Sequence, residues 1–284
     1  MLQLKRLTFL LYYYYKKYLI RNRSANDIFW NWYYRLLTRH HGLRMLDQNE
    51  EEILVKFQRP GFLSLMCYLR IGSSDPIPYD QVFIQSEYYP LLSLIEKNKD
   101  MGDIRYIMDA GGNIGLTTLY LKQYFPAAKI LIIEPDERNY YQIQKNISVN
   151  KLAGVNPVKA GIWSHDAYLS INHPEGLMNQ TALMVAESST PTGLKGVSVN
   201  SVADSNSFPE IDILKMDIEG TEEILFNDPV FRQTLIKRVR YLALEIHDRA
   251  KNAPLIHRFF TENGFAFNEI SETTFAVNTK LAGK

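Results

Sequence analysis

Residues 106–115 read YIMDAGGNIG, a short apolar run that ends in a glycine-rich turn. Residues 115–125 continue with one apolar helical face, and Pro126 follows them. Glycines between a strand and a helix permit a tight turn and let a ligand approach the N–H groups at the helix start. The dinucleotide fingerprint G-x-G-x-x-G fails, because from Gly111 its later glycine positions hold Asn113 and Leu116. The turn therefore predicts a ligand site, and an NAD-linked enzyme is the disfavoured alternative on the same fold.

Strand and helix patterns alternate on the C-terminal side of this turn. The expected strands are 106–108, 129–133, 155–162, 211–216 and 239–246, and a closing hairpin follows at 265–270 and 274–277. The expected helices are 115–125, 137–150, 221–226 and 253–263. The polar stretch 164–208 is expected to hold a short hairpin around 167–172 and a loop. This alternation predicts an α/β domain with a mostly parallel sheet covered on both faces, and ligands bind at the carboxyl ends of such strands.

The residues before the turn have a different pattern. Period-two alternation at 53–57 and 63–69, around Pro60-Gly61, predicts a hairpin. We expect a loop at Pro76 and Pro78, and a helix from Pro90 to about Lys99. The predicted organisation is a helical segment at 1–45, a hairpin with a lead-in helix at 46–100, and a cofactor-binding domain at 101–284.

Composition narrows the class of protein. Of 284 residues, 46% are apolar and 22% are charged, so the chain is neither disordered nor collagen-like. The single cysteine, Cys67, excludes an intramolecular disulfide and a zinc site built of several cysteines, and it fits a reducing compartment. No run approaches the roughly 18–20 apolar residues that span a bilayer. We expect a cytoplasmic protein.

The net charge of +1 hides an asymmetry. Residues 1–45 carry nine Lys and Arg against one acid, Asp27, and they also hold seven Tyr, two Trp and two Phe. The other 239 residues carry 23 Lys and Arg against 30 Asp and Glu. The basic segment is expected either to pack as amphipathic helices on the main domain or on a second copy, or to make peripheral contact with the inner face of a membrane. Nucleic acid is not an expected partner, because the acidic remainder repels phosphates.

Carboxylates beside the turn indicate which ligand it binds. Asp109 ends the first strand, where it could bind the ammonium of an amino-acid ligand. Glu134 ends the second strand, nineteen residues after Gly115, where it could accept hydrogen bonds from two ribose hydroxyls. An acid for an amine, a glycine turn and an acid for a ribose together describe S-adenosylmethionine. We expect Glu134 to sit at an open strand end, so that its replacement weakens cofactor binding and hardly changes stability. Trp163 could stack on adenine or pack in the core.

Four blocks in order resemble the FkbM family of class I S-adenosylmethionine-dependent methyltransferases. The family's D-x-G-A-N-x-G is matched by residues 109–115, with Gly112 in place of the usual alanine. Its E-P-x-P-x-N is matched by residues 134–139, with Glu137 where the second proline usually stands. Its K-x-D-[VI]-E-G is intact at residues 215–220, and an acid-x-His follows at 245–247.

This resemblance covers about residues 65–277, and it implies a fold and an activity. The fold is the Rossmann-like class I methyltransferase fold, with a mostly parallel seven-stranded sheet, an antiparallel C-terminal hairpin strand and an N-terminal helical and hairpin extension. The cofactor is S-adenosylmethionine, and the cofactor-binding residues are Asp109, Gly111, Asn113, Gly115, Glu134 and Trp163. Family members typically O-methylate sugars or related small polar acceptors, and the segment near residue 70 resembles members linked to polysaccharide synthesis.

The catalytic candidates emerge at two strand ends. Lys215, Asp217 and Glu219 alternate to one side of an extended segment, and Glu245 and His247 do the same at the next strand. We expect Asp217, Glu245 and His247 to be catalytic, with His247 a general base whose pKa is about 6.5 unless neighbours shift it. Asp217 could instead cap the short helix, His247 could be structural, and Glu219 is expected to be a helix-start carboxylate. The same three catalytic candidates could bind a divalent metal, although none is expected.

We therefore expect an S-adenosylmethionine-dependent O-methyltransferase acting on a small-molecule or glycan acceptor. The alternative from another class is a weakly catalytic scaffold, which keeps the cofactor fold while its basic segment docks glycan-synthesis enzymes or a membrane.

Overall fold

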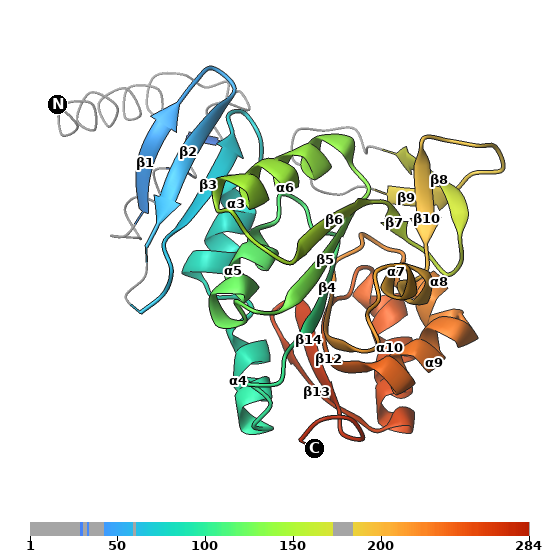
Figure 1. Ribbon diagram of the computed structural model, residues 1–284. Helices are drawn as coiled ribbons and strands as arrows, with labels where there is room; N and C mark the ends of the chain where they lie inside the picture. The colour runs from blue at the N-terminus through green and yellow to red at the C-terminus, as the bar shows by residue number, and fades with distance from the viewer. Residues whose placement is uncertain (1–28, 31–32, 34–42, 59–60, 173–183, 284) are drawn as a thin grey trace. The chain divides into compact units, whose positions relative to one another are not determined.

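The computed structural model describes residues 29, 30, 33, 43–58, 61–172 and 184–283. These residues form two compact units that divide after Gln85, and each is described by itself (Figure 1). The expectations for residues 1–45 lie mostly outside the described residues. Our predicted division at residue 100 stays a prediction. In the structure, the helix that follows Tyr88 belongs to the second unit.

The first unit contains a three-stranded antiparallel sheet in the order β1-β2-β3. Its strands are β1 (Leu43–Gln48), β2 (Glu52–Phe57) and β3 (Leu65–Arg70). The predicted hairpin is confirmed as β2 and β3, and β1 was not foreseen. The loop predicted around Pro76 is wrong, because α3 (Pro76–Tyr79) and the π-helix η1 (Asp80–Ile84) occupy it. Proline suits the first turn of a helix, where its missing N–H would have no partner.

The second unit is built on a seven-stranded sheet in the order β13-β14-β12-β11-β4-β5-β6. All neighbours in it are parallel except at β14, which is antiparallel to both β12 and β13. The strands are β4 (Tyr106–Ala110), β5 (Lys129–Glu134), β6 (Val155–Lys159), β11 (Ile211–Met216), β12 (Val239–Glu245), β13 (Phe265–Ile270) and β14 (Thr273–Asn278). The predicted Rossmann-like class I sheet, with its antiparallel C-terminal hairpin strand, is confirmed.

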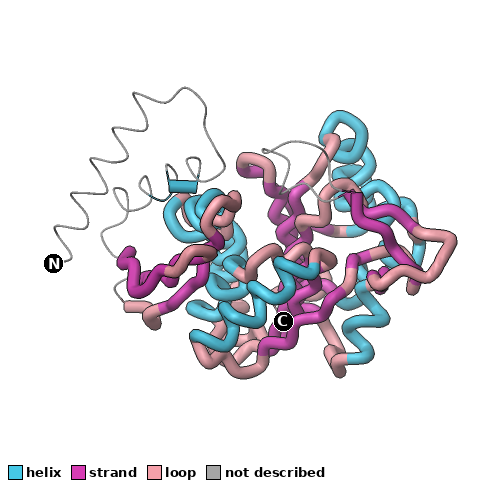
Figure 2. Tube along the Cα trace, turned by 90° about the horizontal axis from the view of Figure 1, so that it is seen from above, coloured by secondary structure: helices cyan, strands magenta, loops and turns pink. Residues whose placement is uncertain are grey.

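Helices cover both faces of this sheet, as Figures 1 and 2 show. One side carries α4 (Tyr89–Lys97), α5 (Leu116–Tyr124) and α6 (Glu137–Val149). The other carries α7 (Val199–Ser205), α8 (Glu222–Asn227), α9 (Pro229–Arg238) and α10 (Arg249–Asn263). Neither α7 nor α9 was predicted. Both have side-chain caps, since Ser198 and Asp228 accept bonds from the N–H groups of Ser201 and Phe231.

The strand predicted at 155–162 is wrong at its end, because the chain leaves the large sheet after Lys159. Residues Gly161–Ile162 form β7 of a second, four-stranded sheet in the order β7-β10-β8-β9. Its other strands are β8 (Ala167–Asn172), β9 (Met184–Glu187) and β10 (Leu194–Val197). A Cβ at Gly161 would lie 2.8 Å from Cδ1 of Leu169, so glycine allows the close approach of β7 to the side chains of this sheet. The first and last strands of this second sheet in the chain, β7 and β10, are parallel partners, so the chain enters and leaves the sheet at neighbouring positions.

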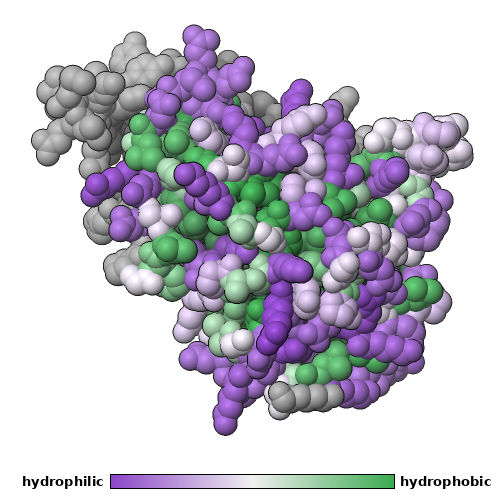
Figure 3. Space-filling model, viewed as in Figure 1, coloured by the Kyte–Doolittle hydropathy of each residue, from purple (hydrophilic) through white to green (hydrophobic). Residues whose placement is uncertain are grey.

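Apolar side chains of the strands and of α7–α10 form a continuous buried core on one face of the large sheet. On the surface shown in Figure 3, hydrophilic side chains surround smaller apolar patches. Among the described residues, no helix has the length and hydropathy that crossing a bilayer requires.

Candidate active site

The glycine-rich turn, which we call the cofactor loop (residues 109–115), is held between β5 and β11. The N–H groups of Gly111 and Gly112 both donate to the carbonyl of Ile133, at 2.9 and 3.1 Å. Gly111 has a φ of +77°, and a Cβ at this position would lie 1.7 Å from the carbonyl oxygen of Asp217. Only glycine fits here, for conformational and steric reasons together.

Glu134, at the end of β5, supports the same loop. One oxygen accepts from the N–H of Asn113 at 2.7 Å, and the other accepts from the N–H of Asp136 at 2.9 Å and from the Asn139 amide at 3.4 Å. The side chain is 3% exposed, so the expectation of an open strand end is wrong. Burial raises the pKa of Glu134 to about 7, although these hydrogen bonds partly offset it. Its replacement should therefore affect both the loop and the fold.

Asp109 lies fully buried at the end of β4 and faces Lys215. Its Oδ1 is 3.4 Å from Lys215 Nζ, and its Oδ2 accepts from the Thr118 hydroxyl at 2.8 Å. Lys215 Nζ also donates to the carbonyl of Gly111 at 2.6 Å. Burial alone would lower the pKa of Lys215, but the charge of Asp109 outweighs it and holds the ammonium protonated. A direct contact of Asp109 with a ligand's ammonium stays a prediction.

The remaining cofactor candidates lie at the helix start and beside the second sheet. Asn113 and Gly115 both have positive φ, +49° and +86°, and Gly115 is the N-cap of α5. Trp163 is buried with Leu169 and Leu194, and its Nε1 donates to Glu187 at 3.2 Å. This agrees with packing in a core, and stacking on adenine stays a prediction.

The catalytic candidates meet because β11 and β12 are parallel neighbours whose carboxyl ends share one edge of the sheet. His247 Nε2 is 3.9 Å from Asp217 Oδ1 and 3.8 Å from Glu245 Oε1. The predicted juxtaposition of Asp217, Glu245 and His247 is therefore present.

Two further carboxylates complete this group. Glu219 Oε2 is 3.3 Å from His247 Nε2, so Glu219 belongs to the cluster as well as to the segment before α8. Glu222, which is fully buried, holds His247 Nδ1 at 2.8 Å. Glu222 was not among the residues predicted from the sequence. Its signal was only a position in the first turn of α8, one helical turn beyond Ile218, with no motif to mark it. We call Asp217, Glu219, Glu222, Glu245 and His247 the strand-end cluster.

The cluster changes the chemistry expected of its histidine. Burial by itself lowers the pKa of His247, but the hydrogen bonds to Glu219 and Glu222 outweigh it and raise the pKa to about 11. The neighbours therefore shift the pKa of His247 away from the ordinary 6.5, and the imidazole holds both protons at neutral pH in this arrangement. Burial and the negative charge of Asp217 raise the pKa of Glu245, and burial likewise raises that of Glu87 nearby. Glu245 is thus a stronger base than an ordinary carboxylate.

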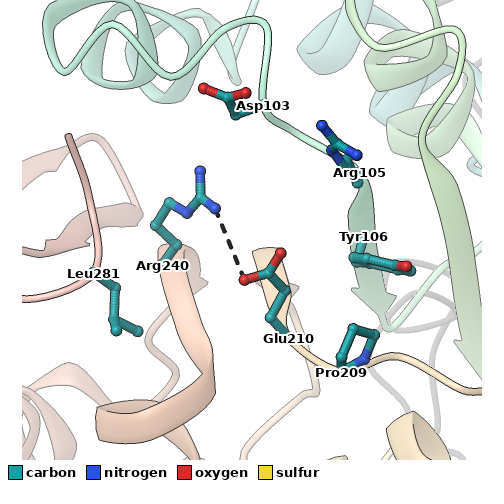
Figure 4. A pocket seen from close by; sticks show the side chains of 7 residues that line it. All are labelled: Asp103, Arg105, Tyr106, Pro209, Glu210, Arg240 and Leu281. Atoms are coloured by element: carbon teal, nitrogen blue, oxygen red, sulfur yellow. Dashed lines mark ion pairs between the residues drawn. The ribbon is translucent and has the colours of Figure 1, made fainter. Parts of the chain in front are cut away.

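A pocket of about 410 Å³ lies at the opposite ends of the same strands (Figure 4). It is lined by residues at the amino ends of β4, β11 and β12, among them Tyr106, Glu210 and Arg240. Arg240 lies 3.9 Å from Glu210 and 2.9 Å from the buried Asp212, so its charge is matched within the fold. This pocket is separate from the cofactor loop.

A family comparison matches the same blocks. The model of the methyltransferase FkbM domain matches residues 109–267, which is more than half of the chain. The chain belongs to the FkbM methyltransferase family. The FkbM match begins at the first residue of the cofactor loop and includes Glu134, Lys215 and every member of the strand-end cluster.

Two curated relatives of this FkbM domain are fungal. Methyltransferase 1 of Beauveria bassiana is 29% identical in an alignment 143 residues long, which covers 42% of this chain and 56% of the relative. Methyltransferase sdnD of Sordaria araneosa is 36% identical over 83 residues, which are 29% of this chain and 32% of the relative. The chain therefore matches only about half, or less, of the length of these relatives.

Solved structures give more distant matches. Methyltransferase FkbM from Methylobacillus flagellatus KT is 16% identical with a TM-score of 0.42, and the match covers 62% of this chain and 44% of that one. The N-terminal domain of human METTL16 in complex with SAH is 15% identical with a TM-score of 0.39, over 72% and 67% of the two chains.

Proposed function

We propose that this protein is an S-adenosylmethionine-dependent O-methyltransferase that methylates a hydroxyl of a sugar, a glycan or a related small polar acceptor. The observation that carries the proposal is the position of Asp217. Its main-chain oxygen borders Gly111 of the cofactor loop, and its carboxylate faces His247 in the strand-end cluster. A methyl donor on the loop and an acceptor at the cluster would therefore be adjacent, and such positioning supplies much of the rate of a methyl transfer.

The residues of the loop fit this cofactor. Glu134 keeps about one acceptor site beyond those used by its three N–H donors, because a carboxylate offers about four. A ribose hydroxyl would donate to it, and Gly111 and Gly115, which have positive φ and no side chain, leave the approach to the backbone open. When bound, S-adenosylmethionine supplies an electrophilic methyl group on a sulfonium.

The strand-end cluster supplies the acceptor chemistry. Asp217 and Glu245 would accept hydrogen bonds from the acceptor's hydroxyls and so orient them. Glu245 would take the proton of the reacting hydroxyl at a carboxylate oxygen, since burial and Asp217 raise its pKa. His247 would act as a positioning residue, with its Nε2 between the carboxylates of Asp217, Glu219 and Glu245.

The charge of the cluster supports a neutral acceptor. The cluster contains four carboxylates, which outnumber the two cationic side chains in or beside it, Lys215 and His247. Such a surface accepts hydrogen bonds from hydroxyls and repels phosphates. We therefore favour a neutral sugar hydroxyl over a nucleic acid.

Calorimetry with S-adenosylmethionine tests the cofactor assignment. Glu134→Ala should weaken binding by about 1.5–3 kcal/mol, because a charge-assisted bond to a ribose hydroxyl is lost. Glu137→Ala is the matched control. Glu137 is an exposed carboxylate three residues along the chain that pairs with Lys159, so its replacement should leave the affinity unchanged. Equal losses in both variants would refute the ribose assignment.

Transfer of a labelled methyl group tests the acceptor. The wild-type protein should label neutral oligosaccharides and should not label RNA oligonucleotides of similar size. Cofactor binding without labelling of any acceptor would favour the scaffold alternative instead. Labelling of RNA alone would overturn the acceptor class.

A further inference from the structure

The strand-end cluster holds a mixed set of nitrogen and oxygen atoms that the methyl-transfer proposal uses only in part. Asp217, Glu219 and His247 each offer one ligand atom, and these atoms lie within 4.8 Å of one another. All three side chains are partly exposed, so an ion and its remaining waters could reach them. Glu219 takes no part in the proposed proton transfer.

The distances suit a single ion. Ligand atoms about 2.1 Å from a divalent cation in octahedral geometry lie roughly 3 Å from one another. His247 Nε2 is already 3.3 Å from Glu219 Oε2 and 3.9 Å from Asp217 Oδ1. The Asp217 and Glu219 oxygens lie within 4.8 Å of each other, so a contraction of at most about 2 Å by side-chain rotation would bring the three atoms onto one ion.

A separate observation comes from Glu222. This side chain is fully buried, and its Oε1 fixes His247 Nδ1 at 2.8 Å, which turns Nε2 toward the two carboxylates. Its other oxygen, Oε2, has no hydrogen-bond partner among the described residues. A carboxylate behind the far nitrogen of a histidine is the usual outer partner of a metal-bound imidazole. The protonated imidazole compensates the charge of Glu222, and a cation at Nε2 would do the same through the ring after displacing the Nε2 proton.

The local charge also favours a cation. Among the described residues, this group includes the carboxylates Glu87, Asp109, Asp217, Glu219, Glu222 and Glu245. Lys215 Nζ is shared between Asp109, the carbonyl of Gly111 and Asp217, from whose Oδ2 it lies 3.9 Å, so Lys215 and His247 together offset only part of this negative charge.

From these observations we infer that Asp217, Glu219 and His247 form a divalent-cation site, with Glu222 as the buried partner that orients the imidazole. One nitrogen and two carboxylate oxygens with open positions suit a borderline ion such as Mn²⁺ better than Ca²⁺. The ion takes the place of the Nε2 proton, which leaves to solvent, while Glu222 keeps the proton on Nδ1.

Manganese binding to the full chain tests this without cofactor or acceptor, so its outcome is independent of the methyl-transfer proposal. Protein freed of metal by chelator should bind one Mn²⁺ per chain, measured as loss of the free-ion signal in electron paramagnetic resonance, and Mg²⁺ should compete. Pulsed measurements should show coupling of the bound Mn²⁺ to an imidazole nitrogen. His247→Gln should lose that coupling.

A matched pair of variants separates the buried partner from general acidity. Glu222→Gln should weaken Mn²⁺ binding about 10- to 100-fold, the usual effect of losing a partner behind a ligand. Glu223→Gln removes the next carboxylate of the same helix, which pairs with Lys251 at the surface, and should leave the affinity unchanged. Circular dichroism confirms that each variant is folded. Absence of stoichiometric binding to the wild type, nitrogen coupling that persists in His247→Gln, or equal losses in the two glutamate variants would overturn the inference.

Discussion

Alanine at Gly111 should be far more damaging than alanine at another glycine of the same conformation. Gly154 is the matched control, because its φ of +70° is close to the +77° of Gly111 and a Cβ there meets only ordinary contacts, the nearest at 3.6 Å. Both variants incur the left-handed strain of about 1–2 kcal/mol. Both also gain about 0.4–1 kcal/mol from a less flexible unfolded chain. The difference between them therefore isolates the steric term.

That term follows from the 1.7 Å distance between the added Cβ and the carbonyl oxygen of Asp217. The obstacle is main chain, so no rotamer change relieves it, and the loop must separate from β11. Separation would break the bond from the Asp217 N–H to the Ala110 carbonyl and that from Lys215 Nζ to the Gly111 carbonyl. A neutral and a charge-assisted bond contribute about 1 and about 1.5–3 kcal/mol, so Gly111→Ala should lose about 2.5–4 kcal/mol more than Gly154→Ala.

Urea unfolding followed by circular dichroism measures this difference, and calorimetry should show that only Gly111→Ala loses S-adenosylmethionine binding. Gly112→Ala should fall between the two, because its Cβ would meet the side chain of Ile132 at 2.1 Å, which can move, rather than main chain. Equal stability losses at Gly111 and Gly154 would refute the reasoning, since the loop would then have room to separate from β11 without cost.

Three other outcomes are expected. The folded pKa of Glu134, about 7, exceeds the unfolded value of 4.5, so the folded state binds more protons between these limits and ligand-free stability should fall as pH rises from about 4.5 to 7. The part due to Glu134 is on the order of 3 kcal/mol at most, and it is measured as the difference in unfolding free energy between the wild type and Glu134→Gln across this range. Equal slopes of stability against pH in the two proteins would contradict it. Lys215→Met leaves the buried Asp109 without its cation and should cost about 3–5 kcal/mol in urea unfolding, part of which Asp109→Asn in the same chain should restore; no recovery would contradict the pairing. Tyr241→Phe removes a 2.7 Å hydrogen bond to the buried Asp100 and should lower the free energy of unfolding by about 1–3 kcal/mol, and a change near zero would show that water replaces the hydroxyl.

The sheet and the cofactor loop were predictable because their chemistry is local. Strands with continuous apolar runs and a turn that requires positive φ at Gly111 each leave a mark within a few residues. Helix α9 left a weaker mark, since apolar residues such as Val230, which is exposed, do not share one face with Phe231 and Leu235. This helix therefore lacks the apolar period of 3.6 that would have marked it in the sequence. Its Asp228 cap and its packing against neighbouring elements stabilise it instead.

The sequence was enough to predict which residues meet at the site, but not their protonation or burial. Parallel pairing of β11 and β12 brings Asp217, Glu245 and His247 together, as the strand-end argument expected. The pKa of His247 depends on Glu222, which no motif marks and which approaches from a helix. Likewise, Glu134 is buried because residues 113 and 136 fold around it. Such a contact depends on the three-dimensional arrangement and leaves no local pattern in the sequence.

The pairing of β7 with β10 bears on how this domain can change in length. The two strands hold the start and the end of the second sheet together, so additional residues between β9 and β10 need not disturb the large sheet. Doubling a flexible connection costs only about 0.6 kcal/mol in closure entropy, which is small beside the burial of the main core. Insertions and deletions should therefore be tolerated between these strands, and they should not be tolerated in the cofactor loop, where the main chain of Asp217 leaves no room even for a Cβ at Gly111. The domain separates a part that can vary in length from a part that cannot.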